Sequence, residues 1–150
     1  MIRNLKKAVK FDKDDDSNAK SGGTASVRQG KLRDAELIQK HKIVDVAVKI
    51  LFANEKTDPK LVESFKYEVA IMTSLPESPY LIKTIGYCEK PMSIVMKFYP
   101  MNMQELLDRG DFFVKNEAKL LASMEVALGM QLIHGKDIIH FDLKPGTGNE

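Results

Sequence analysis

A short run near the end of the sequence combines residue types suited to general-base chemistry. An apolar pair leads into His140-Phe141-Asp142-Leu143-Lys144-Pro145. The carboxylate of Asp142 could orient a substrate hydroxyl and accept its proton. Lys144 follows two residues later and could reach the negative charge that develops on a transferred phosphate. The isolated His140 is a poor candidate for a metal ligand, and we expect it to have a packing role.

A second candidate pair is divided between an expected strand and an expected helix. Val46-Ala47-Val48-Lys49 lies in a β-branched, mostly apolar run, and Glu68 follows nineteen residues after Lys49. Glu68 falls beside Phe65 and Val69 on an apolar helix face, where an unpaired carboxylate is costly. A lysine at the end of a strand is also common as an ordinary surface residue. Because Glu68 needs a partner, we predict an ion pair between Lys49 and Glu68.

Two stretches near the start are less specific. Gly22-Gly23-Thr24-Ala25-Ser26-Val27, taken alone, fits a hairpin turn better than a phosphate-binding loop. The aspartates between positions 12 and 16 could bind calcium, but the stretch lacks the glycine and the closing glutamate of the twelve-residue calcium loop. A solvated chain is the better interpretation, and we expect residues 1–17 to be a mobile polar lead-in.

The composition narrows the class of protein. The 150 residues include 43% hydrophobic residues, enough for a core, and the formal net charge of +2 implies no nucleic-acid or membrane partner. Cys88 is the single cysteine, which excludes an internal disulfide and fits a reducing compartment. No signal-peptide core or membrane-spanning run is present. We therefore expect a soluble, cytoplasmic protein.

Hydrophobic spacing and breaker residues predict the elements that position these groups. Strands are expected over residues 25–32, 35–39, 43–52, 80–86 and 92–99. Helices are expected over residues 60–75, 103–108 and 115–134. The last helix is apolar around most of its circumference, which is normal for a helix buried on several sides. Because little chain is left to cover it, we expect an exposed apolar patch and either self-association or partial disorder beyond about Pro100.

The motifs together resemble the protein kinase catalytic domain, over about residues 18–145. His140 to Lys144 is similar to the catalytic loop His-Arg-Asp-Leu-x-x-x-Asn, and residues 46–49 match the Val-Ala-x-Lys strand. The turn before Val27 resembles the Gly-x-Gly-x-x-Gly-x-Val loop, although Lys20 and Ala25 replace its first and third glycines. Lys144 resembles the serine/threonine branch more than the tyrosine branch.

The resemblance implies a set of site residues. Asp142 and Lys144 take the catalytic positions, and Phe141 replaces the arginine that grips a phosphorylated activation segment in the family. Thr147 stands where the family has a metal-binding asparagine, so Asn149 is the one metal candidate, with no metal site assigned firmly. The implied ATP-binding residues are Gly22, Val27, Ala47, Lys49, Glu68 (paired with Lys49), Met96 as gatekeeper, and Lys97, Phe98 and Tyr99 as hinge.

The expected fold is α+β. Residues 18–100 are predicted to form a kinase-like small lobe with a five-stranded antiparallel sheet and one helix. Residues 101–150 are predicted to form a partial large lobe that ends at the catalytic loop. The Asp-Phe-Gly motif that follows this loop in the family does not occur in the sequence.

The resemblance implies ATP-dependent phosphorylation of serine or threonine in proteins, with ATP and Mg²⁺ as cofactors. Because the metal ligands are incomplete, we expect the 150-residue chain to be inactive or severely impaired. The alternative is a non-catalytic, pseudokinase-like module that binds a partner kinase or a scaffold. A protein substrate or protein partner is expected in either case.

Overall fold

The structure is a computed structural model that describes residues 1–11, 20–21, 25–52, 58–110 and 116–145. It divides into two compact units. Unit 1 comprises Met1–Ser74 and Thr84–Phe98, and unit 2 comprises Leu75–Lys83 and Tyr99–Asn149. This division differs from the predicted small lobe of residues 18–100, because residues 1–11 join unit 1 and residues 75–83 join unit 2.

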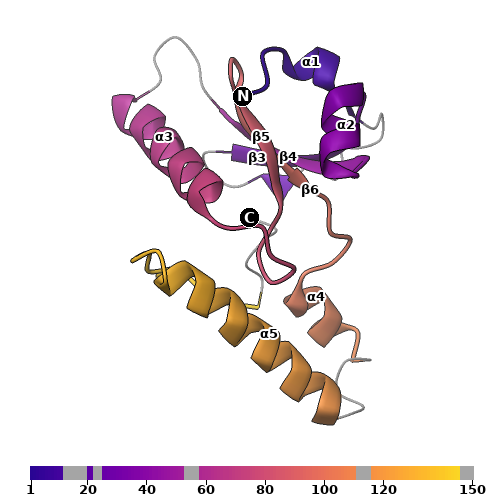
Figure 1. The fold of residues 1–150 in the computed structure, drawn as a ribbon, viewed down its shortest axis with the longest axis vertical. Helices are drawn as coiled ribbons and strands as arrows, with labels where there is room; N and C mark the ends of the chain where they lie inside the picture. Colours follow the sequence, from indigo (N-terminus) through magenta and orange to yellow (C-terminus); the bar gives the residue numbers. More distant parts are fainter. Residues whose placement is uncertain (12–19, 22–24, 53–57, 111–115, 146–150) are drawn as a thin grey trace. The chain divides into compact units, whose positions relative to one another are not determined.

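Unit 1 is built on an antiparallel sheet, shown in Figure 1. Its strands are β1 (Val9–Phe11), β2 (Lys20–Ser21), β3 (Ala25–Leu32), β4 (Asp45–Leu51), β5 (Thr84–Glu89) and β6 (Met92–Lys97). The order is β1-β3-β4-β6-β5, and the two-residue β2 also pairs with β3. β1 pairs with residues 30–32 and β2 with residues 26–27, so both lie along one edge of β3. The main path has the five antiparallel strands that the sequence predicts in number, although β1 takes the place of the strand predicted over residues 35–39.

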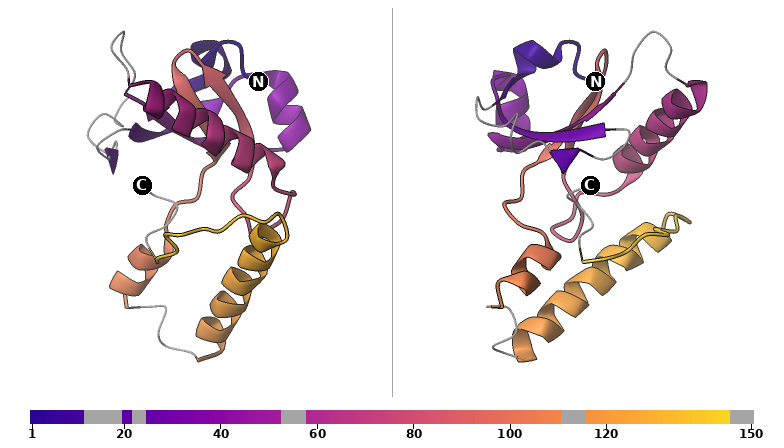
Figure 2. Two further views of the ribbon diagram at one scale, coloured as in Figure 1. Left: turned by 90° about the vertical axis from the view of Figure 1, so that its left-hand side faces the viewer. Right: turned by 180° about the vertical axis from the view of Figure 1, so that it is seen from behind.

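Helices cover both faces of this sheet. α3 (Pro59–Ser74) lies on one face, and α1 (Leu5–Ala8) and α2 (Ala35–His41) lie on the other, as the views of Figure 2 show. The prediction of one helix in the small lobe was therefore wrong. The strand predicted over residues 35–39 is the helix α2, because the Asp34 carboxylate accepts hydrogen bonds from the N–H groups of Glu36 and Leu37. Lys42 ends the helix in a left-handed conformation, with φ of 54°.

Residues 1–11 pack on the sheet, with residues 9–11 as strand β1, where the sequence predicted a mobile lead-in. Ile2 and Leu5 are 6% and 3% exposed, and the backbone N–H of Ile2 donates to the carbonyl of Tyr87 on β5, at 2.7 Å. The prediction weighed the lysines of this segment, whereas the apolar residues between them recur at three- and four-residue spacing and decide its position. Residues 12–17 of the predicted lead-in lie outside the described residues.

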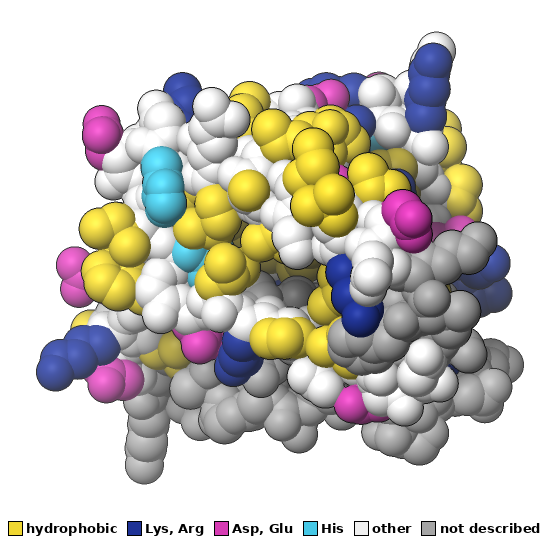
Figure 3. Space-filling view, turned by 90° about the horizontal axis from the view of Figure 1, so that it is seen from below, with side chains coloured by type: hydrophobic (Ala, Val, Ile, Leu, Met, Phe, Trp, Pro, Cys, Tyr) yellow, Lys and Arg dark blue, Asp and Glu magenta, His cyan; other side chains and the backbone are white. Residues whose placement is uncertain are grey.

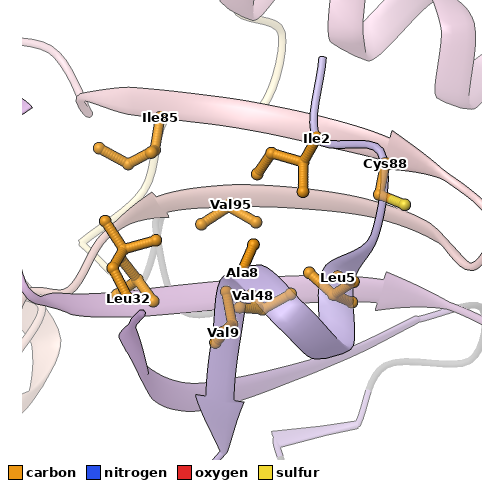
Figure 4. Packing of buried hydrophobic residues seen from close by; sticks show 10 residues of the cluster. Ile2, Leu5, Ala8, Val9, Leu32, Val48, Ile85, Cys88 and Val95 are labelled. Atoms are coloured by element: carbon orange, nitrogen blue, oxygen red, sulfur yellow. The ribbon is translucent and has the colours of Figure 1, made fainter. Parts of the chain in front are cut away.

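Two apolar clusters fill the two faces. The cluster beneath α1 and α2 is shown in Figure 4; it consists of Ile2, Leu5, Ala8, Val9, Leu32, Val46, Val48, Ile85, Cys88 and Val95. The cluster beneath α3 consists of Ala25, Leu51, Phe65, Ile94 and Met96. Alternation along the strands produces both sets, since neighbouring residues of a strand point to opposite faces. The strand predicted over residues 80–86 begins only at Thr84.

Unit 2 contains α4 (Met103–Asp108) and α5 (Asn116–His134), close to the helices that the sequence predicts. Asn102 and Glu105 form a capping box at the start of α4. A Cβ atom at Gly129 would lie 2.8 Å from the carbonyl oxygen of Tyr80. Glycine therefore lets the segment of residues 75–83 lie directly against α5.

The surface of α5 is rich in apolar side chains. Leu120, Leu121 and Met124 are 63%, 60% and 52% exposed. Figure 3 looks from below the view of Figure 1 and shows yellow apolar side chains over much of this surface. The expected exposed patch is therefore present on α5. Within the residues described, no helix is both long enough and apolar enough to span a membrane.

Candidate active site

The strand register gathers several predicted site residues on one face of the sheet. Val27 lies opposite Lys49, and Ala47 lies opposite Met96. Residues directly opposite in an antiparallel pair share a face, as do alternate residues of one strand. Val27, Ala47, Lys49 and Met96 therefore share the face against which α3 packs. A ligand bound by these four residues would have to meet this face of the sheet.

The expected ion pair between β4 and α3 is present. Lys49 Nζ lies 2.7 Å from Glu68 Oε1, within hydrogen-bond distance. The two side chains are 24% and 35% exposed, so both groups are partly withdrawn from water. α3 places Glu68 three residues from the buried Phe65, which brings the carboxylate to the sheet. The pair fixes a lysine ammonium group on the face defined by the strand register.

The glycine-containing turn is described only at its two flanks. Lys20 pairs with Val27 and Ser21 pairs with Ser26, so a hairpin connects β2 and β3. Gly22 lies outside the described residues, and its predicted contact with a phosphate stays a prediction. Lys20 is the first residue of β2, and Ser21 is the residue directly before positions 22–24. This agrees with the hairpin interpretation of the sequence.

The predicted hinge spans the division between the two units. Met96 is 8% exposed and belongs to the apolar cluster beneath α3. The backbone N–H of Phe98 donates to the carbonyl of Asp45 at 3.2 Å, whereas Lys97 is exposed. Tyr99, 41% exposed, is the first residue after unit 1. The backbone N–H of Phe98 is therefore already hydrogen-bonded within the sheet at the point where the hinge leaves it.

The catalytic-loop candidates form an ion pair of their own in unit 2. Lys144 Nζ lies 3.2 Å from Asp142 Oδ2, and these side chains are 40% and 74% exposed. Sequence reasoning assigned a role to each residue but did not predict this contact. The geometry arises from a turn: Phe141 has φ of 53°, and the N–H of Asp142 donates to the carbonyl of His140 at 2.6 Å. A spacing of two residues was the one signal that could have indicated the pair.

The end of the loop is fixed to α4. The N–H of Gln104, in the first turn of α4, donates to the carbonyl of Pro145 at 3.0 Å. His140 is half-buried, and its Nδ1 atom is buried without a hydrogen-bond partner among the described residues. Phe141 is 91% exposed. The loop thus presents a carboxylate, an ammonium group and a phenyl ring to solvent, between a backbone anchor and a partly buried histidine.

The described residues offer little to a metal ion. Across residues 1–11, 20–21, 25–52, 58–110 and 116–145, no group of three histidine, cysteine, aspartate or glutamate side chains is placed to hold one. Thr147 and the metal candidate Asn149 lie outside these residues. Asp142 and Lys144 belong to unit 2, and Lys49 and Glu68 belong to unit 1.

An antiparallel sheet with a helix-held lysine, followed by helices and an Asp-x-Lys loop, defines the class of the protein kinases. The family model for protein tyrosine and serine/threonine kinases matches residues 16–145. The chain therefore belongs to the protein kinase family. The match includes both candidate pairs and leaves residues 1–15 outside it.

Relatives support this assignment. The chain is 38% identical over 108 residues to a probable serine/threonine-protein kinase of Dictyostelium discoideum, covering 67% of this chain and 8% of the relative. It is 33% identical over 134 residues to a dual specificity protein kinase of the same organism, covering 85% and 19%. A serine/threonine/tyrosine-protein kinase of Arabidopsis thaliana is 30% identical over 112 residues, covering 71% and 28%. The chain thus spans less than a third of each of these relatives.

Proposed function

We propose that this chain supplies the small lobe and catalytic loop of an ATP-dependent kinase that phosphorylates serine or threonine in proteins. The ion pair between Lys49 and Glu68 carries the proposal, because it fixes an ammonium group on one sheet face with Val27, Ala47 and Met96. A positioned lysine is the group that such chemistry needs for the phosphates of a nucleotide. The kinase relatives support the same reaction class.

ATP fits the residues of unit 1. Lys49 would contact the phosphates and Glu68 would hold it in place. Ala47 and Met96 would meet the adenine, and backbone groups of the hinge at residues 97–99 would bond its edge. ATP would supply the phosphoryl group that is transferred, and Mg²⁺, which the family uses, would offset the negative charge of its phosphates. The described residues do not by themselves fit a metal ion, so no step of the chemistry is assigned to metal ligands of this chain.

Asp142 and Lys144 would act on the other reactant. The Asp142 carboxylate would orient a serine or threonine hydroxyl and accept its proton as the oxygen forms a bond to the γ-phosphorus of ATP and ADP leaves. Lys144, held 3.2 Å from this carboxylate, would stabilise the negative charge that develops on the phosphoryl oxygens. The pair is largely exposed, which leaves room for a protein substrate.

Cys88, a buried free thiol, supports a cytoplasmic location.

Nucleotide binding by the 150-residue chain tests the proposal. We expect weak binding of a fluorescent ATP analogue and a loss of roughly tenfold or more in Lys49→Met, because one charge-assisted contact is removed. Lys60→Met is the matched control, since Lys60 is an exposed lysine on α3. Equal affinity of the Lys49 variant and the unmodified chain would show that the nucleotide binds elsewhere.

A non-catalytic interaction module remains a second candidate, and one observation favours it. Leu120, Leu121 and Met124 are exposed on α5, and apolar patches of this kind mark protein-binding surfaces. The partner would be a kinase, a scaffold or a second copy of the chain. Binding of such a partner without any nucleotide affinity would favour this candidate over the enzyme.

A further inference from the structure

Residues 1–11 form a segment that we name the N-terminal strap. It contains α1 and β1, and it reaches from the edge of β3 to β5 at the other end of the sheet. The N–H of Ile2 bonds the carbonyl of Tyr87 at 2.7 Å, and Figure 4 shows the apolar side chains of the strap against the sheet. Ile2, Leu5, Ala8 and Val9 are each less than 7% exposed. The family match begins only at residue 16.

All charged side chains of the strap are basic. They are Arg3, Lys6, Lys7 and Lys10, and all four are exposed. None of them forms an ion pair with another residue that the structure describes. Val9 and Phe11 pack into the cluster beneath α1 and α2, so Lys10, which lies between them on β1, points to the opposite face of the sheet. Arg3, Lys6 and Lys7 remain as the exposed cations on the outer side of the strap.

Neighbouring basic residues differ in the side of the sheet that they reach. The strand register places Lys10 directly opposite Lys31, so these two lysines share the face against which α3 packs and lie away from the outer side of the strap. Arg33 is exposed, and its N–H donates to the carbonyl of Ala8 at 2.8 Å. Two nearby acids are engaged elsewhere: Asp34 caps α2, and Asp45 lies 3.7 Å from Lys31. Arg33 therefore adds to the positive charge beside the strap.

We propose that the outer face of the strap binds the anionic headgroups of a phospholipid bilayer while its apolar face stays docked on the sheet. Each lysine or arginine near an anionic bilayer surface contributes about 1 kcal/mol of attraction, and Arg3, Lys6, Lys7 and Arg33 supply such cations on and beside this face. A peptide partner would need apolar anchors, and the apolar residues of the strap are used in the core. Single-stranded nucleic acid would need exposed aromatic rings, and Phe11, the one aromatic residue of the strap, is half-buried beside Arg28. The proposal is independent of the kinase activity. It departs from the expectation of no membrane partner, because that expectation rests on the net charge of the whole chain and not on this segment.

Co-sedimentation of the whole chain with vesicles tests the proposal. The whole chain retains the aspartates at positions 12, 14, 15 and 16, which compete with lipid headgroups for the cations of the strap. We expect binding to vesicles of about three parts phosphatidylcholine to one part phosphatidylserine, and none to phosphatidylcholine alone. The double variant Lys6→Gln/Lys7→Gln should bind roughly 30-fold more weakly, at about fivefold per cation removed. Salt should weaken binding of the unmodified chain, because exposed charges are screened.

The matched control is Lys60→Gln/Lys66→Gln, which removes the same charge from exposed positions of α3 on the other face of the sheet. This variant should bind as the unmodified chain does. Equal losses in the two double variants would overturn the proposal in favour of net charge alone. Binding to an acidic peptide or an oligonucleotide but not to the anionic vesicles would overturn it in favour of that partner. Cys88, 2% exposed in the cluster beneath the strap, should resist thiol reagents in all variants and so verify the fold.

Discussion

Lys49 has an ammonium group that is already bonded to Glu68, so its position is set before any ligand arrives. The pair could be predicted because a carboxylate on an apolar helix face needs a partner wherever the helix docks. The contact between Asp142 and Lys144 could not be predicted in the same way. It depends on the left-handed backbone conformation of Phe141, which phenylalanine rarely adopts and which the sequence therefore does not indicate.

Glu68→Gln tests whether the ion pair positions Lys49. We expect weaker binding of an ATP analogue by roughly tenfold, because a neutral amide holds the ammonium group less firmly. Stability should fall by only about 1 kcal/mol, since both side chains are partly exposed to water. Fluorescence titration and urea unfolding measure the two effects. Glu63→Gln, an exposed position on the same helix, is the control, and an equal loss of affinity in both variants would contradict the positioning role.

Asp142 provides a second prediction, which concerns catalysis. We expect no measurable phosphate transfer from labelled ATP to a generic protein substrate by the 150-residue chain, because its metal ligands are incomplete. Labelled phosphate in the substrate would overturn this prediction if the Asp142→Asn variant abolished the labelling and the Asp137→Asn variant did not. Asp137 is an exposed aspartate outside the loop.

The elements of the fold were predictable where one periodicity dominates. α3, β4 and β6 each have a long, consistent pattern, and the structure contains them. The strand predicted over residues 35–39 was wrong because the adjacent apolar residues at 37 and 38 fit a helical and a strand period equally well. The N-cap Asp34 therefore decides that this segment is the helix α2. The α1 segment was missed because its apolar residues are few and become significant only when the sheet is present to bury them.

Capping of α2 can be tested with a conservative pair of variants. Asp34→Ala removes two hydrogen bonds to the first turn and should lower the free energy of unfolding by about 1 kcal/mol. Asp34→Asn should retain most of the free energy of unfolding that the alanine variant loses, because asparagine caps helices as well as aspartate does. Urea unfolding followed by circular dichroism measures both. Equal stability of the alanine variant and the unmodified chain would show that the packing of α2 alone holds it.

The contact between β1 and β3 depends on a glycine. A Cβ atom at Gly30 would lie 2.7 Å from the Lys10 carbonyl oxygen and 2.8 Å from Val9 Cγ1. Gly30→Ala should therefore displace the strap, cost about 1–3 kcal/mol and speed the labelling of Cys88. Gly86→Ala is the control, since its nearest neighbours are the side-chain atoms of Ile2 at 3.2 and 3.3 Å, which can shift. Equal labelling rates in the two variants would argue that the strap does not protect Cys88.

At the scale of the whole molecule, the order of motifs predicted the family, but the division into units was not predicted. Sequence order suggests one boundary after residue 100, whereas residues 75–83 pack with unit 2 although unit 1 elements flank them. The contact of Gly129 with Tyr80 accounts for this placement. Such a contact joins residues far apart in the chain, and no local pattern of residue types encodes it.

The exposed face of α5 leads to the last prediction, which concerns association. Covering a leucine or methionine side chain is worth roughly 1.5–3 kcal/mol, and Leu120, Leu121 and Met124 are each more than half exposed. We expect the chain to self-associate in sedimentation and residues 116–134 to exchange their amide hydrogens faster than residues 46–50. Leu121→Gln/Met124→Gln should reduce association, whereas Tyr67→Gln, an equally exposed position on α3, should not. A monodisperse monomer with α5 amides as protected as those of β4 would contradict the prediction, because it would mean that this apolar face needs no cover.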